Sequence, residues 1–162
     1  MKKAIALQSH HFQSLDLAPA QAVIDPIITA SDAAQLLSNP DLTFSFEIDF
    51  PREPEDPREL SEIPEVRLWF IRLDKRYPWL PLYLDWESGE LSRYSAMLVP
   101  HQFSKMDGIR YNPEALEIFV MGKVFVLDAW LREKGIDGKS RLKFMTQMLG
   151  YELDDALFDL LS

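Results

Sequence analysis

The sequence contains no cysteine. The chain therefore has no disulfide framework, no thiolate nucleophile and no cysteine-ligated zinc or iron–sulfur site. This composition fits a reducing compartment, so we expect a cytoplasmic protein without a cofactor. We also expect no metal site, because neighbouring side chains of an extended segment, as we expect for His10 and His11, point to opposite faces, whereas metal ligands must converge.

Long uninterrupted apolar runs are also absent. The apolar stretch near the start covers only Ala4 to Leu7, which is too short for the centre of a secretory signal. The most apolar segment, residues 112–135, contains Glu117, Lys123 and Asp128, and charges near the centre of a bilayer are costly. We therefore expect no membrane insertion.

Basic residues are scarce relative to acidic ones. The 17 lysines and arginines face 26 aspartates and glutamates, which gives a formal net charge of -9. The acidic residues are spread along the chain, so a phosphate backbone would be repelled almost everywhere, and we expect no nucleic-acid partner. A basic protein surface is the partner that this charge favours.

What the sequence does contain is enough apolar material for a core. The chain has 162 residues, of which 47% are hydrophobic and 12% aromatic, far from the composition of disordered chains. A chain of this length forms one domain, and no repeat or long linker divides it. We predict a single domain over 1–162, with a loosely ordered segment over 1–20.

Local patterns predict an α+β fold. Residues 42–50 alternate between apolar and polar side chains, as in a strand with one solvated face. Further strands are predicted for 21–29, an edge strand around Pro26, and for the hairpin strands 81–86 and 91–99. Helices are predicted for 31–37, 64–77, 112–135, 140–149 and 154–161. The fold class is a small, mainly antiparallel sheet with helices packed on one face and a helical C-terminal third.

The predicted helix over 112–135 is apolar on most of its circumference. It begins at Pro113 and ends at Gly135. A helix that is apolar on most sides must be covered on most sides. It is therefore either the central helix of the fold or partly reserved for another protein. We expect a monomer, and a homodimer through this helix is the alternative.

No combination of residues identifies a catalytic centre. Gly138-Lys139-Ser140 lacks the first glycine of a phosphate-binding loop, because Glu133 occupies that position. His101 lacks an identifiable nucleophile or acid partner. Carboxylates that a small hydrolase could use are plentiful, and this class remains the alternative function; they are Glu47, Asp49, Asp74, Asp85 and Glu87.

Aromatic and polar residues give the better signal for a binding surface. Trp79 lies between two prolines, which stiffen its backbone, and tryptophan anchors are enriched at interfaces. Position and residue type suggest a partner-binding set of Trp79, Tyr94, His101, Gln102, Phe103, Tyr111 and Asn112. The acidic, proline-rich connector 51–62 is expected at the surface, either simply solvated or as a docking strip for a basic partner.

Several segments resemble the cyanobacterial branch of the chlororespiratory reduction 6 family. The resemblance covers roughly Leu42 to Leu161 and is carried by FPREPEDPRELSEIPEVRLWFIRLD, PWLPLYLDW, AMLVPHQF, GIRYNPEALEIFVM and MLGYELDD. It implies an assembly factor, not an enzyme, for the photosynthetic NAD(P)H dehydrogenase-like complex. The implied partner is a soluble-arm subunit, particularly the iron–sulfur subunit I.

Overall fold

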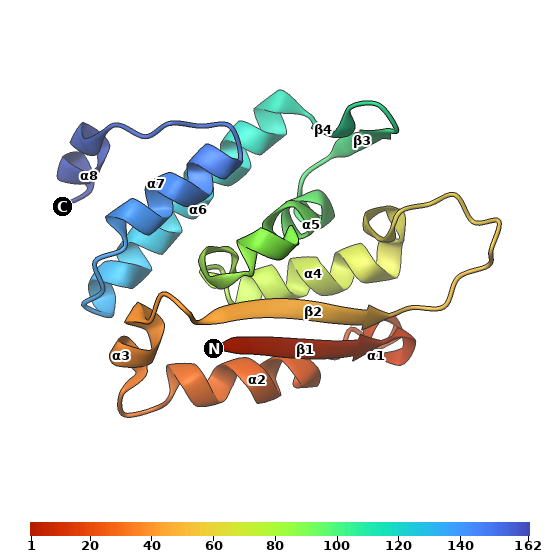
Figure 1. Cartoon of the computed structure of the whole chain (residues 1–162), viewed down its shortest axis with the longest axis horizontal. Helices are drawn as coiled ribbons and strands as arrows, with labels where there is room; N and C mark the ends of the chain where they lie inside the picture. The colour runs from red at the N-terminus through yellow and green to blue at the C-terminus, as the bar shows by residue number, and fades with distance from the viewer.

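The computed structural model describes residues 1–162 as an α+β fold with eight α-helices and two separate two-stranded sheets (Figure 1). The helices are α1 (Ser9–Gln13), α2 (Ala18–Ile28), α3 (Ala33–Ser38), α4 (Pro64–Arg76), α5 (Glu90–Leu98), α6 (Pro113–Glu133), α7 (Lys139–Met148) and α8 (Asp155–Leu161). The strands are β1 (Lys2–Gln8), β2 (Thr43–Asp49), β3 (His101–Ser104) and β4 (Gly108–Tyr111). Three short 3₁₀ turns are η1 (Leu60–Glu62), η2 (Leu80–Tyr83) and η3 (Trp86–Ser88).

The longer sheet is parallel. Strand β1 pairs with β2 in a register that runs from Lys2 opposite Thr43 to Gln8 opposite Asp49. A parallel pair needs a long crossover connection, and helices α1, α2 and α3 supply it. The prediction of a mainly antiparallel sheet is therefore wrong for this sheet, and only the β3–β4 hairpin is antiparallel.

The first residues of the chain belong to the folded core. In β1, Ile5 and Leu7 are buried on one face while Ala4 and Ala6 are exposed, and Phe12 of α1 is fully buried. Residues 2–8 alternate as a half-buried strand does. The segment over 1–20, expected to be loosely ordered, thus contributes directly to the hydrophobic cluster. That the whole chain is one domain stays a prediction.

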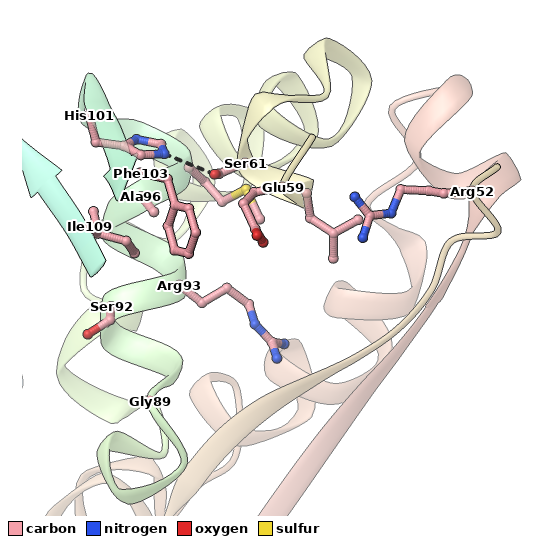
Figure 2. Close-up of a pocket in the computed structure, with 12 residues that line it drawn as sticks. Arg52, Glu59, Ser61, Gly89, Ser92, Arg93, Ala96, His101, Phe103 and Ile109 are labelled. Atoms are coloured by element: carbon pink, nitrogen blue, oxygen red, sulfur yellow. Dashed lines mark hydrogen bonds between the residues drawn. The ribbon is translucent and has the colours of Figure 1, made fainter. Parts of the chain in front are cut away.

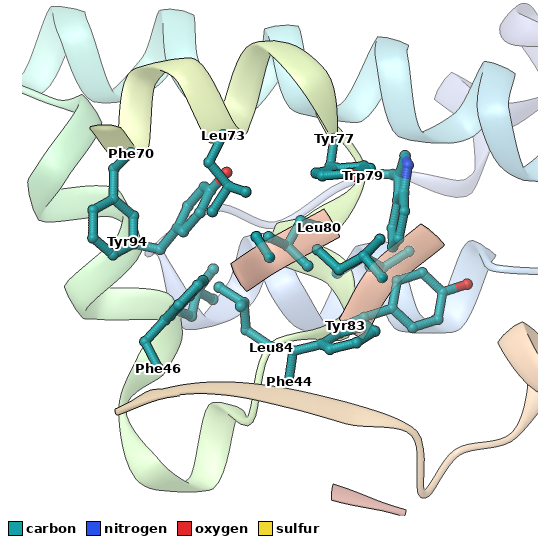
Figure 3. Packing of buried hydrophobic residues seen from close by; sticks show 14 of the residues in the cluster. Phe44, Phe46, Phe70, Leu73, Tyr77, Trp79, Leu80, Tyr83, Leu84 and Tyr94 are labelled. Carbon is teal, nitrogen blue, oxygen red and sulfur yellow. The ribbon is translucent and has the colours of Figure 1, made fainter. Parts of the chain in front are cut away.

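The strand predicted over 42–50 is confirmed as β2. Its inward residues Phe44 and Phe46 are buried, and Glu47 is exposed. The ring centroid of Phe46 lies 5.0 Å from that of Phe70 on α4, and Figure 3 shows Phe70 and Tyr94 beside it. This edge of the sheet is therefore joined to α4 and α5 by aromatic packing.

The edge strand predicted over 21–29 is wrong, because this segment lies in α2. Ile24 and Ile27 are buried one helical turn apart, together with Ala20, and α2 packs along β1. Pro26 lies inside the helix, close to its end. It removes one backbone donor, and burial of the apolar face outweighs that loss.

The predicted hairpin over 81–86 and 91–99 is also wrong. Residues 80–83 and 86–88 form η2 and η3, and residues 90–98 form α5. Leu91, Tyr94 and Ser95 are buried at helical spacing. Gly89 does have the positive φ expected of it, +81°, although it precedes a helix and does not close a hairpin. Only Leu84 retains strand character, through an isolated parallel bridge to Phe44.

The helices predicted over 31–37, 64–77, 112–135, 140–149 and 154–161 are present as α3, α4, α6, α7 and α8. Two side-chain contacts attach helix α6 to α4 and to the segment that follows α4. Lys123 pairs with Asp74 of α4, and the ring of Trp130 stacks on Trp79 with 4.7 Å between centroids and 9° between planes. None of the helices has both the length and the hydropathy needed to cross a membrane.

Candidate functional site

The β3–β4 hairpin brings together five of the seven residues expected to bind a partner. His101 lies opposite Tyr111 in the ladder, Gln102 opposite Arg110, and Phe103 opposite Ile109. Asn112 follows directly, and its amide donates to the carbonyl of Pro100. Residues that are ten positions apart in the sequence therefore lie side by side, with His101, Phe103 and Tyr111 on one face of the hairpin and Gln102 on the other.

His101 and Tyr111 attach the hairpin to the body of the protein. The His101 Nε2 lies 3.0 Å from the Ser61 hydroxyl of η1, and its Nδ1 lies 3.0 Å from the Val99 carbonyl oxygen. The Tyr111 hydroxyl donates to the Ser92 carbonyl of α5 at 3.1 Å, and burial raises the pKa of this hydroxyl. Both side chains are half-buried, so their main observed contacts are internal.

Other hairpin side chains face solvent. Phe103 is 52% exposed and Met106, in the turn, is 94% exposed. Gln102 and Arg110 are also exposed and lie opposite each other. We call these four exposed side chains, Gln102, Phe103, Met106 and Arg110, the hairpin surface; Gln102 and Arg110 lie on the face opposite to that of Phe103. Because the hairpin has only two strands, each strand also has one edge without a neighbouring strand.

Asn112 has a structural role in addition to its exposure. Its side-chain oxygen accepts the amide of Ala115 at 3.0 Å and caps the first turn of α6. The backbone amides of the first turn of a helix have no partner within the helix, and this cap gives one of them, that of Ala115, a hydrogen bond. A partner contact through Asn112 would have to preserve this cap.

Trp79 and Tyr94 are not part of the hairpin surface. Trp79 is 3% exposed and stacks on Trp130, and Tyr94 is completely buried, where its hydroxyl donates to Asp74 Oδ1 at 3.1 Å. Burial is the main cause that raises the pKa of the Tyr94 hydroxyl, and the Asp74 carboxylate raises it further. Both residues stabilise the core and cannot touch a partner while the protein stays folded as it is.

A cleft of about 380 Å³ lies between the hairpin, α5 and η1. Figure 2 shows Phe103 and Ile109 on its hairpin side, Arg52 on the opposite side and Arg93 reaching into the opening below them. Glu59 also lines the cleft, where it contributes a negative charge. The cleft therefore combines an apolar wall with charges of both signs.

The wall beneath the cleft holds a buried carboxyl group. Arg93 donates to the Phe46 carbonyl at 3.0 Å and pairs with Glu90 Oε1 at 3.2 Å. Glu90 is only 4% exposed, and its Oε2 has no hydrogen-bond partner. Burial raises the pKa of Glu90, and the attraction of Arg93 and the Phe46 amide oppose that rise. This ion pair fixes the direction of Arg93.

The carboxylates considered for a hydrolase occupy different parts of the molecule. Asp74 pairs with Lys123, Asp85 pairs with Lys2 at 3.2 Å, and Glu47, Asp49 and Glu87 are exposed. Glu47 and Asp49 line one shallow cavity, whereas Asp85 and Glu87 line another. No group of three or more histidine, aspartate or glutamate side chains is arranged to hold a metal ion.

The sequence analysis predicted neither strand of the β3–β4 hairpin and did not single out the two cleft arginines. Asp107-Gly108 is a turn signal between two extended segments, and Gly108 has φ +69°. This dipeptide would have predicted the hairpin. Nothing local indicates that Arg52 and Arg93, 41 positions apart, line the same cleft.

Comparison with known proteins identifies the family and no structural relative. No solved structure matches this chain. The family model described as Chlororespiratory reduction 6 matches residues 7–160, nearly the whole length. The match includes the hairpin, the cleft and α6. The chain therefore belongs to the Chlororespiratory reduction 6 family.

Proposed function

We propose that this protein is a cytoplasmic assembly factor for the photosynthetic NAD(P)H dehydrogenase-like complex of a cyanobacterium. In this proposal it binds a soluble-arm subunit, the iron–sulfur subunit I, through the hairpin surface, and it catalyses no reaction. Membership of the family supports an assembly role. An assembly factor must hold an exposed surface of its partner and then release it, which requires contact area and no reactive group.

The observation that carries the proposal is the exposure of Phe103 and Met106 on an anchored hairpin. Both are large apolar side chains that face solvent, and such groups in a cluster with a polar rim are typical of interaction sites. The bonds of His101 and Tyr111 hold the hairpin against η1 and α5. The hairpin therefore loses less conformational entropy when a partner binds.

The acidic connector lies beside the same cleft. Glu53 and Glu55 are exposed, and Glu59, near the connector's end, lines the cleft together with Phe103. A partner with a basic rim around an apolar contact would match this arrangement. Charges at such a rim mainly increase the rate of encounter and the selectivity for the partner.

The proposal is tested with the double variant Phe103→Ser/Met106→Ser and purified iron–sulfur subunit I. We expect at least a tenfold loss of affinity, roughly 1.4 kcal/mol, because two exposed anchors are removed without changing the core. The control is Leu160→Ser, which is 82% exposed on α8 at the far end of the molecule from the hairpin (Figure 1). Equal affinity of all three proteins would contradict the hairpin as the docking site.

A second experiment tests the role in the cell. Deleting the gene should lower the amount of assembled complex on native gels, and expression of the wild-type chain should restore it. Unchanged amounts of complex and unchanged electron transfer would refute the assembly role itself. The alternative, a carboxylate-dependent hydrolase, gains no support from the separate positions of the carboxylates.

A further inference from the structure

One face of helix α6 remains apolar and uncovered. Ile118 is 74% exposed and Phe125 48%, although both lie inside the helix, and Val126, 43% exposed, lies on the flank of this face. The opposite face is buried in the body of the protein by Val120, Val124, Leu127 and Leu131. The exposed face is therefore held in a fixed direction, and a helix this apolar is normally covered on both sides.

The exposed face follows the heptad spacing of a coiled coil. Its residues recur at alternating intervals of three and four positions, and we call them the α6 seam: Ala115, Ile118, Gly122, Phe125, Ala129 and Arg132. Small residues occupy every seventh position at Ala115, Gly122 and Ala129. Large residues occupy the positions between them. Five of these six residues are exposed, and Ala115 is half-buried.

Gly122 permits a second helix to approach closely. A methyl group placed on this glycine would meet no atom within 4 Å. No contact within the chain therefore requires glycine here, and its φ is not in the left-handed region. Glycine in a helix interior costs about 1 kcal/mol relative to alanine. Close contact with a second molecule would explain why glycine occupies this position.

We propose that α6 pairs with α6 of a second copy of this chain in an antiparallel, two-fold symmetric homodimer. An antiparallel pairing centred between Gly122 and Phe125 places Phe125 against the partner's Gly122. The next layer places Ile118 against the partner's Ala129. Each layer then joins one large and one small side chain, which is how facing positions fill space without voids. The two-fold axis repeats each layer.

The ends of the seam are also complementary in charge. In this register, Glu114 in the first turn comes beside the partner's Arg132 in the last turn, and symmetry forms the pair twice. The antiparallel direction also places the positive end of each helix dipole near the negative end of the other. Within its own chain, Arg132 pairs with Asp128 at 2.8 Å and donates to the Phe158 carbonyl of α8 at 2.9 Å, so a pair with the partner's Glu114 would exchange part of these internal contacts. In this proposal we favour the homodimer, the alternative weighed from the sequence, over the expected monomer.

The first test is the molar mass in solution, measured by sedimentation equilibrium over a dilution series. We expect twice the 18.8 kDa of one chain at high concentration, with dissociation on dilution. Gly122→Leu should raise the dissociation constant at least tenfold, because the new side chain occupies the space of the partner's Phe125. A single-chain mass at every concentration would overturn the proposal.

The matched control is Glu117→Leu, which adds the same side chain at an exposed position outside the seam. Circular dichroism should show that both variants remain folded, since leucine favours helix more than glycine does. We expect the control to dimerise like the wild type. A Gly122→Leu protein that dimerises equally well would show that a different surface is used.

A cross-linking test fixes the direction of the pair, and the absence of native cysteine makes it unambiguous. Ile118→Cys and Ala129→Cys chains are mixed and oxidised. The antiparallel dimer predicts a disulfide between the two different variants, with little product from either variant alone. Efficient cross-linking of Ile118→Cys with itself would overturn the antiparallel arrangement.

Discussion

His101 of strand β3 and Ser61 of η1 are 40 positions apart in the sequence, and the imidazole Nε2 lies 3.0 Å from the serine Oγ. The other ring nitrogen faces the Val99 carbonyl at 3.0 Å. A carbonyl can only accept a hydrogen bond, so neutral His101 carries its proton on Nδ1 and accepts at Nε2 from the Ser61 hydroxyl. This pair fixes the hairpin relative to the connector.

Replacement of Ser61 by alanine should loosen the hairpin. The variant removes one largely buried hydrogen bond, and we expect the free energy of unfolding to fall by about 1 kcal/mol. Amide hydrogen exchange in β3 and β4 should accelerate more than in the rest of the chain. The control is Ser92→Ala, because only the backbone carbonyl of Ser92 bonds Tyr111. Equal effects of the two substitutions would show that the His101 bond does not hold the hairpin.

Replacement of Trp79 by alanine should act on stability and not directly on partner binding. The indole is buried against Trp130, and the truncation of a buried tryptophan costs about 3–5 kcal/mol. Urea unfolding monitored by circular dichroism measures this loss. The fraction that remains folded should bind the proposed partner, the iron–sulfur subunit I, with unchanged affinity. Wild-type stability combined with weaker binding would instead make Trp79 a contact residue.

Secondary structure could be predicted from the sequence where a local pattern allowed only one interpretation. Strand β2 alternates with period two, and α6 has a cap at Asn112 and a positive-φ glycine at 135. Both elements were predicted within about two residues of their observed ends. Helix α5 was missed because the short segment 91–98 fits either period, and only packing of Tyr94 between α4 and β2 selects the helix.

The candidate site depended only in part on local patterns. The exposed residues Gln102 and Phe103 were predicted from their position after Pro100. Tryptophan is enriched both in cores and at interfaces, so the burial of Trp79 depended on where α6 packs. The parallel pairing of β1 and β2 depended on a crossover of three helices, in which α2 was first interpreted as a strand.

The ion pair between Lys123 and Asp74 should contribute strongly to the attachment of α6. The Lys123 side chain is 9% exposed and that of Asp74 22%. Lys123→Met leaves the Asp74 carboxylate largely buried without its cation, and we expect a loss of about 3 kcal/mol. Adding Asp74→Asn removes the negative charge and keeps an oxygen for the Tyr94 hydroxyl. The double variant should therefore be more stable than Lys123→Met, as thermal unfolding can measure. A less stable double variant would contradict this account.

Glu90 should make the protein less stable as the pH rises. Burial raises the pKa of the folded Glu90 above its value in the unfolded chain. Its contribution to stability is therefore complete below the unfolded pKa and is lost as the pH rises through the folded pKa. Asp56 and Asp155, with lowered pKa values, act in the opposite direction. The difference in unfolding free energy between the wild type and Glu90→Gln, measured as a function of pH, isolates the contribution of Glu90. If this difference does not change between pH 4 and pH 8, Glu90 makes no pH-dependent contribution to stability.

The acidic connector should control the rate at which the partner is found. Glu53→Gln/Glu55→Gln removes two exposed charges, and exposed rim charges act mainly on association. We expect a several-fold slower association with the proposed partner, the iron–sulfur subunit I, at low salt, measured by stopped flow. Above about 0.5 M salt the Debye length is only a few ångströms, so the variant and the wild type should become equal.

The control for this experiment removes the same charge at the other end of the molecule. Glu152→Gln/Asp159→Asn changes two exposed carboxylates next to and within α8, which lies far from the connector (Figure 1). If the net charge of -9 alone governed the encounter, both double variants would associate at the same rate. A rate reduced only by the connector variant would locate the steering charge beside the cleft, where Phe103 is exposed.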